Sequence, residues 1–174
     1  MAIPVVETER LILRGHTLED FPAFAAMRAD PVVMKYLGKG DLLDEEEAWL
    51  RFQSIAGHWQ LKGFGTWAIE ERASGAVIGA LGYTDKKRPS SHPARGAPEM
   101  GWSLAASAHG KGFASEALRA ALVWGCEHFG PERVVCVISD DNTASIRLAE
   151  RHGFRQFATA SRYGLGRRVF ERML

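Results

Sequence analysis

Apolar positions recur along the chain with two periods, one that suits strands and one that suits helices. Short apolar runs bounded by turn residues predict strands at residues 8–14, 65–71, 76–83, 99–105, 133–139, 154–160 and 168–174. Apolar residues spaced three and four apart predict helices from Thr17 to about Asp30, from Asp44 past Trp59, at 113–129 and at 142–152. A chain that combines both periods in this way is predicted to have an α/β fold.

Capping residues mark the starts of the first two helices. Thr17 is followed by Glu19 and Asp20, and Asp44 is followed by three consecutive glutamates. Thr and Asp accept hydrogen bonds from the free N–H groups of a first helical turn, and acidic residues there favour the positive end of the helix dipole. The acidic run after Asp44 is therefore interpreted as a capped helix start rather than as a metal site.

The first half of the chain is predicted to contain an antiparallel hairpin. Residues 65–71 and 76–83 are joined by a short turn at 72–75, and the polar segment 84–98 that follows is predicted to be a loop. The last two strands are expected to lie on either side of a turn at 164–166.

Residues 99–139 are predicted to form a βαβ crossover. The strand at 99–105 leads through the helix at 113–129 to a β-branched run at 133–139, whose composition is typical of a buried strand. A crossover of this kind joins parallel strands, so the sheet is expected to be mixed.

The composition is that of one ordinary folded domain. The 174 residues are 46% hydrophobic and 25% charged, so residues 1–174 are expected to form a single domain with a continuous core. The 22 Lys and Arg residues nearly balance the 21 Asp and Glu residues, and the formal net charge of +1 gives no general attraction for nucleic acid. No run suits a membrane span or a signal peptide, so a cytoplasmic location is expected.

The cysteines and five of the histidines show no metal-ligand spacing. Cys126 and Cys136 do not form a close pair, so both are interpreted as core residues, with neither a disulfide nor a zinc site. The five histidines interpreted as surface or hydrogen-bonded core residues are His16, His58, His92, His128 and His152. No metal is predicted.

A glycine-rich segment lies between the predicted strand at 99–105 and the helix at 113–129. Its sequence is His109-Gly110-Lys111-Gly112-Phe113-Ala114. The free N–H groups of a helix start carry partial positive charge, and glycine lets the backbone approach a ligand closely, so a pyrophosphate fits this position. Two glycines can equally serve only to shape a tight turn. The segment lacks the ending of a P-loop and the position of a dinucleotide fingerprint, which weakens nucleotide hydrolysis and hydride transfer as functions.

This segment resembles the coenzyme A loop of the GNAT acetyltransferase superfamily, whose pattern is Arg/Gln-x-x-Gly-x-Gly/Ala. His109 replaces the usual Arg or Gln, and Gly112 and Ala114 fill the small positions. Three further stretches resemble the RimJ/RimL-type branch, which acetylates N-termini of ribosomal proteins: residues 7–14, residues 99–104, and Asn142-x-x-Ser145-x-x-Leu148 followed by Gly153-Phe154. The resemblance implies a mixed, twisted central sheet of about six to seven strands flanked by about four helices, with one splayed parallel strand pair.

The resemblance also implies a binding site for acetyl-coenzyme A (acetyl-CoA), the acetyl-donor cosubstrate. The backbone of residues 102–104 would lie along the pantetheine arm, and the amides of residues 110–114 would hold the pyrophosphate. Lys111 either adds charge or is a surface lysine, and Asn142 either contacts the pantetheine or only caps its helix. The expected cofactor-binding residues are Trp102, Ser103, Leu104, His109, Gly110, Lys111, Gly112, Phe113, Ala114, Asn142 and Ser145.

Amide formation from a thioester needs a base for the amine, a donor to the carbonyl oxygen and a donor to the departing thiolate. Glu99 begins the strand beside the expected cofactor and is the candidate base, with a strand-edge surface acid as the alternative. An N–H near Leu104 is the candidate donor to the carbonyl oxygen. Ala149 replaces the tyrosine acid of many GNAT enzymes, so the resemblance makes Ser145 the candidate acid and Tyr163 the second candidate.

The resemblance implies an N-acetyltransferase in which a primary amine attacks acetyl-CoA directly in a ternary complex. The acceptor stays open between a protein N-terminal α-amine and a small-molecule amine, and a monomer or homodimer is expected, without nucleic acid, membrane or metal. The basic residues of the loop at 84–98 either are solvated or suit an acidic substrate or the adenosine phosphate: Lys86, Lys87, Arg88 and Arg95. The alternatives are a non-catalytic acyl-CoA sensor, which the missing tyrosine favours, and a general nucleotide site.

Overall fold

The computed structural model describes residues 2–174, without the side chain of Arg162. Its strands form one mixed sheet in the order β1-β2-β3-β4-β5-β6-β8-β7. They are β1 (Val6–Glu7), β2 (Leu11–Arg14), β3 (Thr66–Glu71), β4 (Val77–Thr84), β5 (Glu99–Leu104), β6 (Arg133–Ser139), β7 (Arg155–Arg162) and β8 (Leu165–Met173). The α-helices are α1 (Phe21–Arg28), α2 (Pro31–Met34), α3 (Glu45–Lys62), α4 (Phe113–Phe129) and α5 (Thr143–Arg151).

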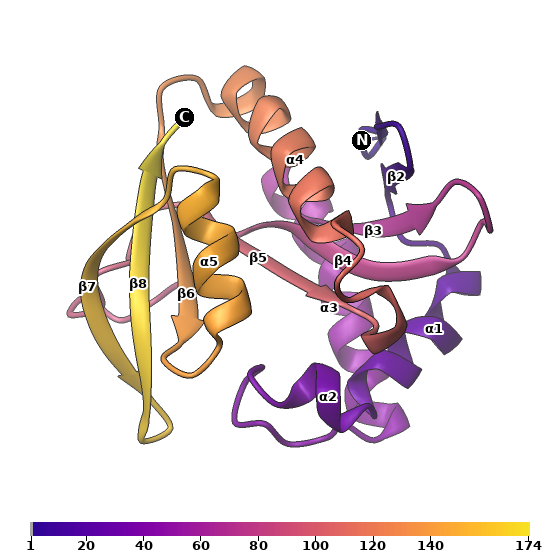
Figure 1. Ribbon diagram of the computed structural model, residues 1–174, viewed down its shortest axis with the longest axis horizontal. Coiled ribbons are helices and arrows are strands. Elements are labelled where there is room, and N and C mark those ends of the chain that lie inside the picture. The colour runs from indigo at the N-terminus through magenta and orange to yellow at the C-terminus, as the bar shows by residue number, and fades with distance from the viewer. Residues whose placement is uncertain (1) are drawn as a thin grey trace.

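Strands β5 and β6 are the parallel pair that the crossover predicted, and they separate after one paired position. Glu99 of β5 lies opposite Val135 of β6, beyond which the two strands diverge (Figure 1). On its other side β5 pairs with β4 along its full length, from Glu99 opposite Thr84 to Leu104 opposite Gly79. One edge of β5 is therefore left without a strand partner in the middle of the sheet.

The α/β class, the mixed sheet and the splayed parallel pair are confirmed, and the described residues contain more elements than expected. The sheet has eight strands because the two residues of β1 form an additional short strand, which pairs with β2 across a turn at Thr8. A fifth helix arises because Asp30 caps the single turn α2. Elements this short leave no periodic pattern. The final hairpin turns at Tyr163 and Gly164, so β8 already begins at Leu165, inside the predicted turn.

The ends of α3 follow the local signals in the sequence. Asp44 Oδ1 accepts a hydrogen bond from the N–H of Glu47 at 2.8 Å, and Glu47 Oε2 accepts from the N–H of Asp44 at 3.1 Å. These reciprocal bonds satisfy two N–H groups that the helix itself cannot. Gly63 ends the helix with φ 71° and ψ 4°, a left-handed conformation that favours glycine.

Helices cover both faces of the sheet. In Figure 1, α4 and α5 lie in front of it and α3 lies behind, while α1 packs on α3 and β4. The Tyr83 hydroxyl on the front face donates to the Ala121 carbonyl of α4 at 3.0 Å. Four of the residues of β4 and β5 that point to the opposite face are small: Ala80, Gly82, Gly101 and Ser103. Helix α1 packs against β4 on this face, whereas Gly101 of β5 is exposed.

The two cysteines lie in different surroundings. Cys136 is buried, but Cys126 is exposed, so the core interpretation was wrong for Cys126. Its position on α4 is in contact with solvent.

Among residues 2–174, no helix combines the length and apolarity needed to cross a bilayer, and no group of three or more His, Cys, Asp or Glu side chains is placed to hold a metal ion.

Candidate active site

The unpaired edge of β5 presents backbone groups toward the splay. Successive residues of a strand direct their N–H and C=O groups to opposite sides. The N–H of Ala105 donates to the Ile78 carbonyl on the β4 side at 2.8 Å, so the backbone groups of Leu104 and Trp102 point the other way. The Pro98 carbonyl, which shares their direction, accepts a hydrogen bond from β6 at 3.1 Å where the strands still pair. Trp102 and Leu104 can therefore pair with a ligand that enters the splay as an added strand.

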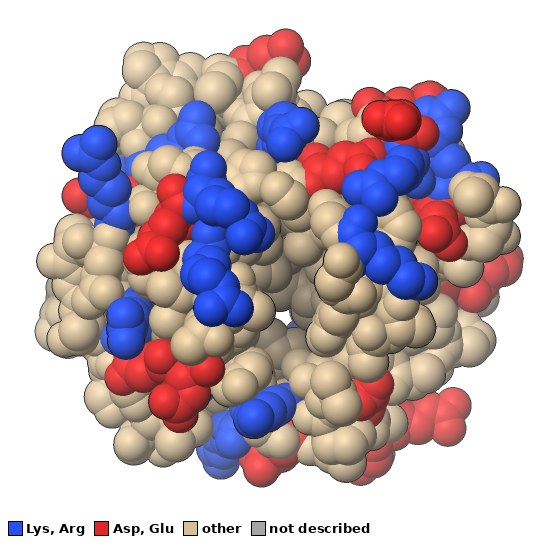
Figure 2. Space-filling view, viewed as in Figure 1, with Lys and Arg blue, Asp and Glu red and all other residues tan. Residues whose placement is uncertain are grey.

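The surface is hollowed beside this edge. Figure 2 shows a deep opening in the middle of the molecule, and comparison with Figure 1 places it between α5 and the β5–α3 region. The N-terminus of α5 reaches β5 here, because Trp102 Nε1 donates to Ser145 Oγ at 3.1 Å. An indole N–H only donates, so the Ser145 hydroxyl keeps its own proton to give to another group.

Asn142 caps α5 beside this contact. Its Oδ1 accepts a hydrogen bond from the N–H of Ser145 at 3.1 Å, so the capping role weighed for Asn142 is confirmed. The side-chain NH₂ group is what Asn142 has left to offer a ligand.

The glycine-rich loop has the conformation expected of an anion-binding helix start. Gly110 and Gly112 have φ values of 75° and 82°, in the left-handed region that favours glycine, and both are exposed. A Cβ built on Gly110 would meet no atom within 4 Å. No side chain of residues 2–174 caps α4, so the N–H groups of its first turn remain available. Free amides at the positive end of a 17-residue helix fit a pyrophosphate group.

The side chains of the loop itself are engaged with the protein or with solvent. His109 Nε2 lies 3.0 Å from the Leu104 carbonyl, which only accepts, so Nε2 carries the hydrogen and ties the loop to the end of β5. Lys111 is exposed, which is compatible with both of its alternatives, added charge beside the loop and a surface lysine. Phe113 is buried and Ala114 packs against the core, so these two residues have only their backbone groups to offer.

Arg10 braces the loop from the N-terminal part of the chain, a role that the sequence did not reveal. Its Nε donates to Glu116 Oε2 at 2.7 Å, its Nη1 donates to the Lys111 carbonyl at 2.9 Å, and its guanidinium lies over the Phe113 ring. Burial alone would raise the pKa of Glu116, but hydrogen bonds from Thr8 and Arg10 lower it below its ordinary value. Arg10 and Glu116 are 106 positions apart, so no local pattern links them.

Glu99 is buried at the position where β5 and β6 still pair, and Arg88 binds its carboxylate. Arg88 Nη2 donates to Oε1 at 2.7 Å and Arg88 Nε donates to Oε2 at 2.9 Å. The two side chains are 11% and 10% exposed, so the alternatives of a surface acid and of a solvated arginine were wrong for this pair. Two buried charges are tolerated together because each neutralises the other. Lys86, Lys87 and Arg95 are exposed.

The structure places the remaining predicted residues in different surroundings. Ser103 follows Trp102 on β5, and its side chain points to the opposite face, toward α1. Ala149 is fully buried in α5. Tyr163 lies at the turn between β7 and β8, with Lys39 Nζ 5.1 Å from the centre of its ring. Of the two candidate acids, Ser145 is the one in contact with β5.

Comparison with known proteins identifies the family. The family model of the acetyltransferase (GNAT) domain matches residues 10–155. The chain belongs to the GNAT acetyltransferase family. The uncharacterized N-acetyltransferase YoaA of Bacillus subtilis (strain 168) is 31% identical to this GNAT acetyltransferase over 163 residues, which cover 92% of this chain and 88% of YoaA.

Solved structures agree with this assignment. A Bordetella pertussis protein assigned to the GNAT acetyltransferase family has a TM-score of 0.85 and 31% identity, over 97% of this chain and 99% of that one. RimL, a ribosomal L7/L12 α-N-protein acetyltransferase solved in complex with coenzyme A, has a TM-score of 0.80 over 98% of both chains at 20% identity, which shows a shared fold. The splay of this GNAT acetyltransferase, with its free β5 backbone and uncapped α4, fits coenzyme A.

Proposed function

We propose that this GNAT acetyltransferase transfers an acetyl group from acetyl-CoA to a primary amine, by direct attack while both substrates are bound. The observation that carries the proposal is the splay, where the free backbone of β5, the amides before α4 and the Ser145 hydroxyl surround one opening. Coenzyme A in the RimL structure and the N-acetyltransferase name of YoaA support the donor and the amine acceptor. The acceptor is either a protein N-terminal α-amine, as in the RimJ/RimL-type branch, or a small-molecule amine.

The chain offers the donor mainly backbone groups. The N–H and C=O groups of Trp102 and the N–H of Leu104 would bind the pantetheine amides, and the amides of residues 110–114 would bind the pyrophosphate. Asn142 would add its side-chain NH₂ group. When bound, acetyl-CoA supplies the acetyl group as an activated thioester.

Three groups would assist the transfer. The N–H of Leu104 would donate to the carbonyl oxygen as negative charge develops there. Ser145, oriented by the Trp102 indole, would donate its hydroxyl proton to the departing sulfur, and solvent would return a proton to Ser145 as Glu99 releases the one that it received. Glu99 would receive the amine proton through water, because Oε1 accepts one hydrogen bond from Arg88 and keeps a second lone pair.

Removal of the Ser145 hydroxyl is expected to slow transfer without weakening donor binding. Ser145→Ala should lower kcat by about 10- to 100-fold, since a positioned proton donor typically contributes this much or more. Steady-state kinetics should show the lower kcat, and calorimetric titration should show a nearly unchanged dissociation constant for coenzyme A. Thr143→Ala removes an exposed hydroxyl from the same helical turn and is the matched control. If Ser145→Ala and Thr143→Ala have equal kcat values, Ser145 is not the acid.

A methyl group on Gly112 is expected to weaken coenzyme A binding by about tenfold or more, because it crowds the amides of the anion site. Gly63→Ala is the control, since Gly63 has φ 71° and ψ 4° and Gly112 has φ 82° and ψ −3°. Each substitution should cost about 1 kcal/mol of stability through left-handed strain. Calorimetric titration with coenzyme A should show weaker binding by the Gly112 variant than by Gly63→Ala. Equal dissociation constants for coenzyme A in both variants would argue against a pyrophosphate at α4.

Melting temperatures with different ligands distinguish the transferase from its alternatives. A ligand at about 100 times its dissociation constant adds ~2.7 kcal/mol of stability. We expect stabilisation by acetyl-CoA and desulfo-coenzyme A but not by ATP or NAD, together with acetyl transfer to an amine. Because buried Ala149 occupies the position of the family's tyrosine, an acyl-CoA sensor is the second candidate. Binding without transfer to any peptide or small amine would favour the sensor, and stabilisation by ATP or NAD alone would contradict both.

A further inference from the structure

Arg28, the last residue of α1, carries a largely buried charge without an acidic partner. Its Nε is buried with no hydrogen-bond partner, and its Nη2 makes only a long contact of 3.4 Å with Ser103 Oγ. No carboxylate within residues 2–174 forms an ion pair with it. Burial, and secondly the charge of Arg51, lowers the pKa of Arg28 to about 10, so its guanidinium stays charged at neutral pH.

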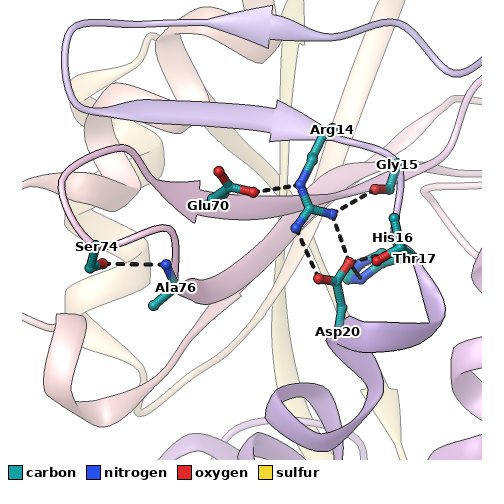
Figure 3. A network of polar contacts seen from close by, with 8 residues as sticks. All are labelled: Arg14, Gly15, His16, Thr17, Asp20, Glu70, Ser74 and Ala76. Atoms are coloured by element: carbon teal, nitrogen blue, oxygen red, sulfur yellow. Dashed lines mark hydrogen bonds and ion pairs between the residues drawn. The ribbon is translucent and has the colours of Figure 1, made fainter.

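Arg14 shows how the same face of the sheet compensates a cation when the fold alone requires it (Figure 3). Its guanidinium donates to Asp20 at 2.7 and 2.9 Å and to Glu70 at 2.6 Å. The hydrogen bond to Asp20, helped by Glu70, raises the pKa of Arg14 above its ordinary value. Among residues 2–174, Arg28 has the ring face of Phe24, 4.7 Å away, and the long contact with Ser103, which together offset a small part of the cost of burying a charge. The charge of Arg28 therefore has no structural counterpart.

Arg28 lies beside open space on β5. Ser103 and Gly101 alternate with Trp102 along the strand, so they point to the face opposite the Trp102 indole. Gly101 is exposed, and a Cβ built there would meet no atom within 4 Å. Between Glu99 and Ser103, the face of β5 that carries Gly101 and Ser103 is thus open to a ligand next to the splay; we call this surface the floor. An acceptor on this floor would reach the splay from the side opposite α4 and α5.

His16 is a second unpartnered polar group near Arg28. Its side chain is only 4% exposed, and neither ring nitrogen has a hydrogen-bond partner in the described part of the chain. Asp20 Oδ2 lies 3.9 Å from Nδ1, beyond hydrogen-bond distance, and the rings of Phe24 and Phe52 meet the imidazole edge to face. Burial lowers the pKa of His16 to about 4, so the ring is neutral at neutral pH. The interpretation of His16 as a surface or satisfied histidine was wrong.

We propose that Arg28 binds a carboxylate of the amine acceptor, with Ser103 as a neutral hydrogen-bonding group beside it. The terminal Nη1 and Nη2 groups form a fork that matches a planar carboxylate, since Nε itself is enclosed by protein atoms. Among residues 2–174, Nη2 makes only the long contact with Ser103 Oγ. The nearby charge of Arg51 attracts the same anion. The acceptor class is then an amine with a nearby acid group, either a free amino acid or a peptide with an acidic side chain near its N-terminus. This inference rests on the proposed transfer function.

Matched acceptors test the proposal. One pair is an amino acid and its α-amide, and the other is a peptide with Glu or with Gln at its second position. We expect the wild type to prefer the acidic member of at least one pair by about tenfold or more in kcat/KM, and Arg28→Met to remove the preference through KM. The pair that responds identifies the source of the carboxylate. Equal kcat/KM values within both pairs, or a preference that survives in Arg28→Met, would overturn the proposal.

Melting temperature gives a readout that does not depend on transfer. Arg28→Met should melt no lower than wild type, because methionine keeps the packing on Phe24 and removes an uncompensated charge. Arg14→Met, which strands two carboxylates, should melt lower and is the control. Acidic acceptors with coenzyme A should stabilise wild type more than neutral ones, and Arg28→Met should lose that difference. If acidic acceptors stabilise only the wild type in this way but no amine is acetylated, the transfer function fails and the Arg28 site stands. If acidic acceptors stabilise the wild type no more than neutral ones, the Arg28 site is contradicted.

Discussion

Arg88→Met is expected to lower the free energy of unfolding by about 3–5 kcal/mol, because it leaves the Glu99 carboxylate buried without its counter-charge. The bidentate contact, with N–O distances of 2.7 and 2.9 Å, replaces the water that both groups give up on folding. Removing Arg88 takes away the electrostatic attraction, but it does not return water to the buried Glu99 carboxylate. Urea unfolding at neutral pH measures the loss directly.

Two further variants separate this charge effect from a general effect of the loop. Arg95→Met changes an exposed arginine of the same loop and should stay within about 0.5 kcal/mol of wild type. The double variant Arg88→Met/Glu99→Gln removes both charges and should recover most of the stability that Arg88→Met loses. If Arg88→Met costs no more than Arg95→Met, the Glu99 carboxylate reaches water without its partner, and the buried pair is not what holds this part of the loop.

Acidification from pH 6.5 to pH 4 is expected to remove about 3 kcal/mol of stability through His16 alone. Burial lowers the pKa of His16 from 6.5 in the unfolded chain to about 4 in the folded protein. Between these values only the unfolded state binds the proton. The contribution of His16 is therefore complete above pH 6.5 and is lost progressively as the pH falls to 4.

Unfolding free energies measured between pH 4 and 7.5 check this expectation. His16→Leu should give a flatter profile than wild type between pH 4 and 6.5. Burial also lowers the pKa of His152, but that contribution is common to both proteins and cancels in their difference. Below pH 4, Asp20 adds a further loss: burial raises its pKa, but hydrogen bonds from Arg14 and Thr17 outweigh this effect. Equal slopes in wild type and His16→Leu would mean that His16 is not buried in neutral form.

The part of the site that we propose binds the donor was largely predictable as local structure. Gly110 and Gly112 precede a helix in the sequence, and the structure places them, with positive φ, at the start of α4. The β-branched run after that helix predicted the parallel partner of β5, and Asn142 predicted the start of α5. Each of these signals acts between residues a few positions apart, so each can be seen in the chain before it folds.

The partners of the charged and polar side chains were not predictable. Trp102 and Ser145 were both singled out, but their hydrogen bond joins residues 43 positions apart. Arg88 looked like a solvated loop residue because it lies in the polar segment 84–98 beside Lys86 and Lys87. Two short elements, β1 and α2, also escaped detection, since two and four residues are too few to show a period.

Local patterns of the chain settled where most strands and helices lie, where the sheet changes from antiparallel to parallel, and where a glycine-rich loop precedes a helix. Folding settled how the arginines are neutralised: within the described residues, Arg14 binds two carboxylates, Arg88 binds one and Arg28 binds none. The difference arises because hydrophobic periodicity and capping depend on near neighbours in sequence, whereas burial and charge compensation depend on groups that only the assembled sheet brings together.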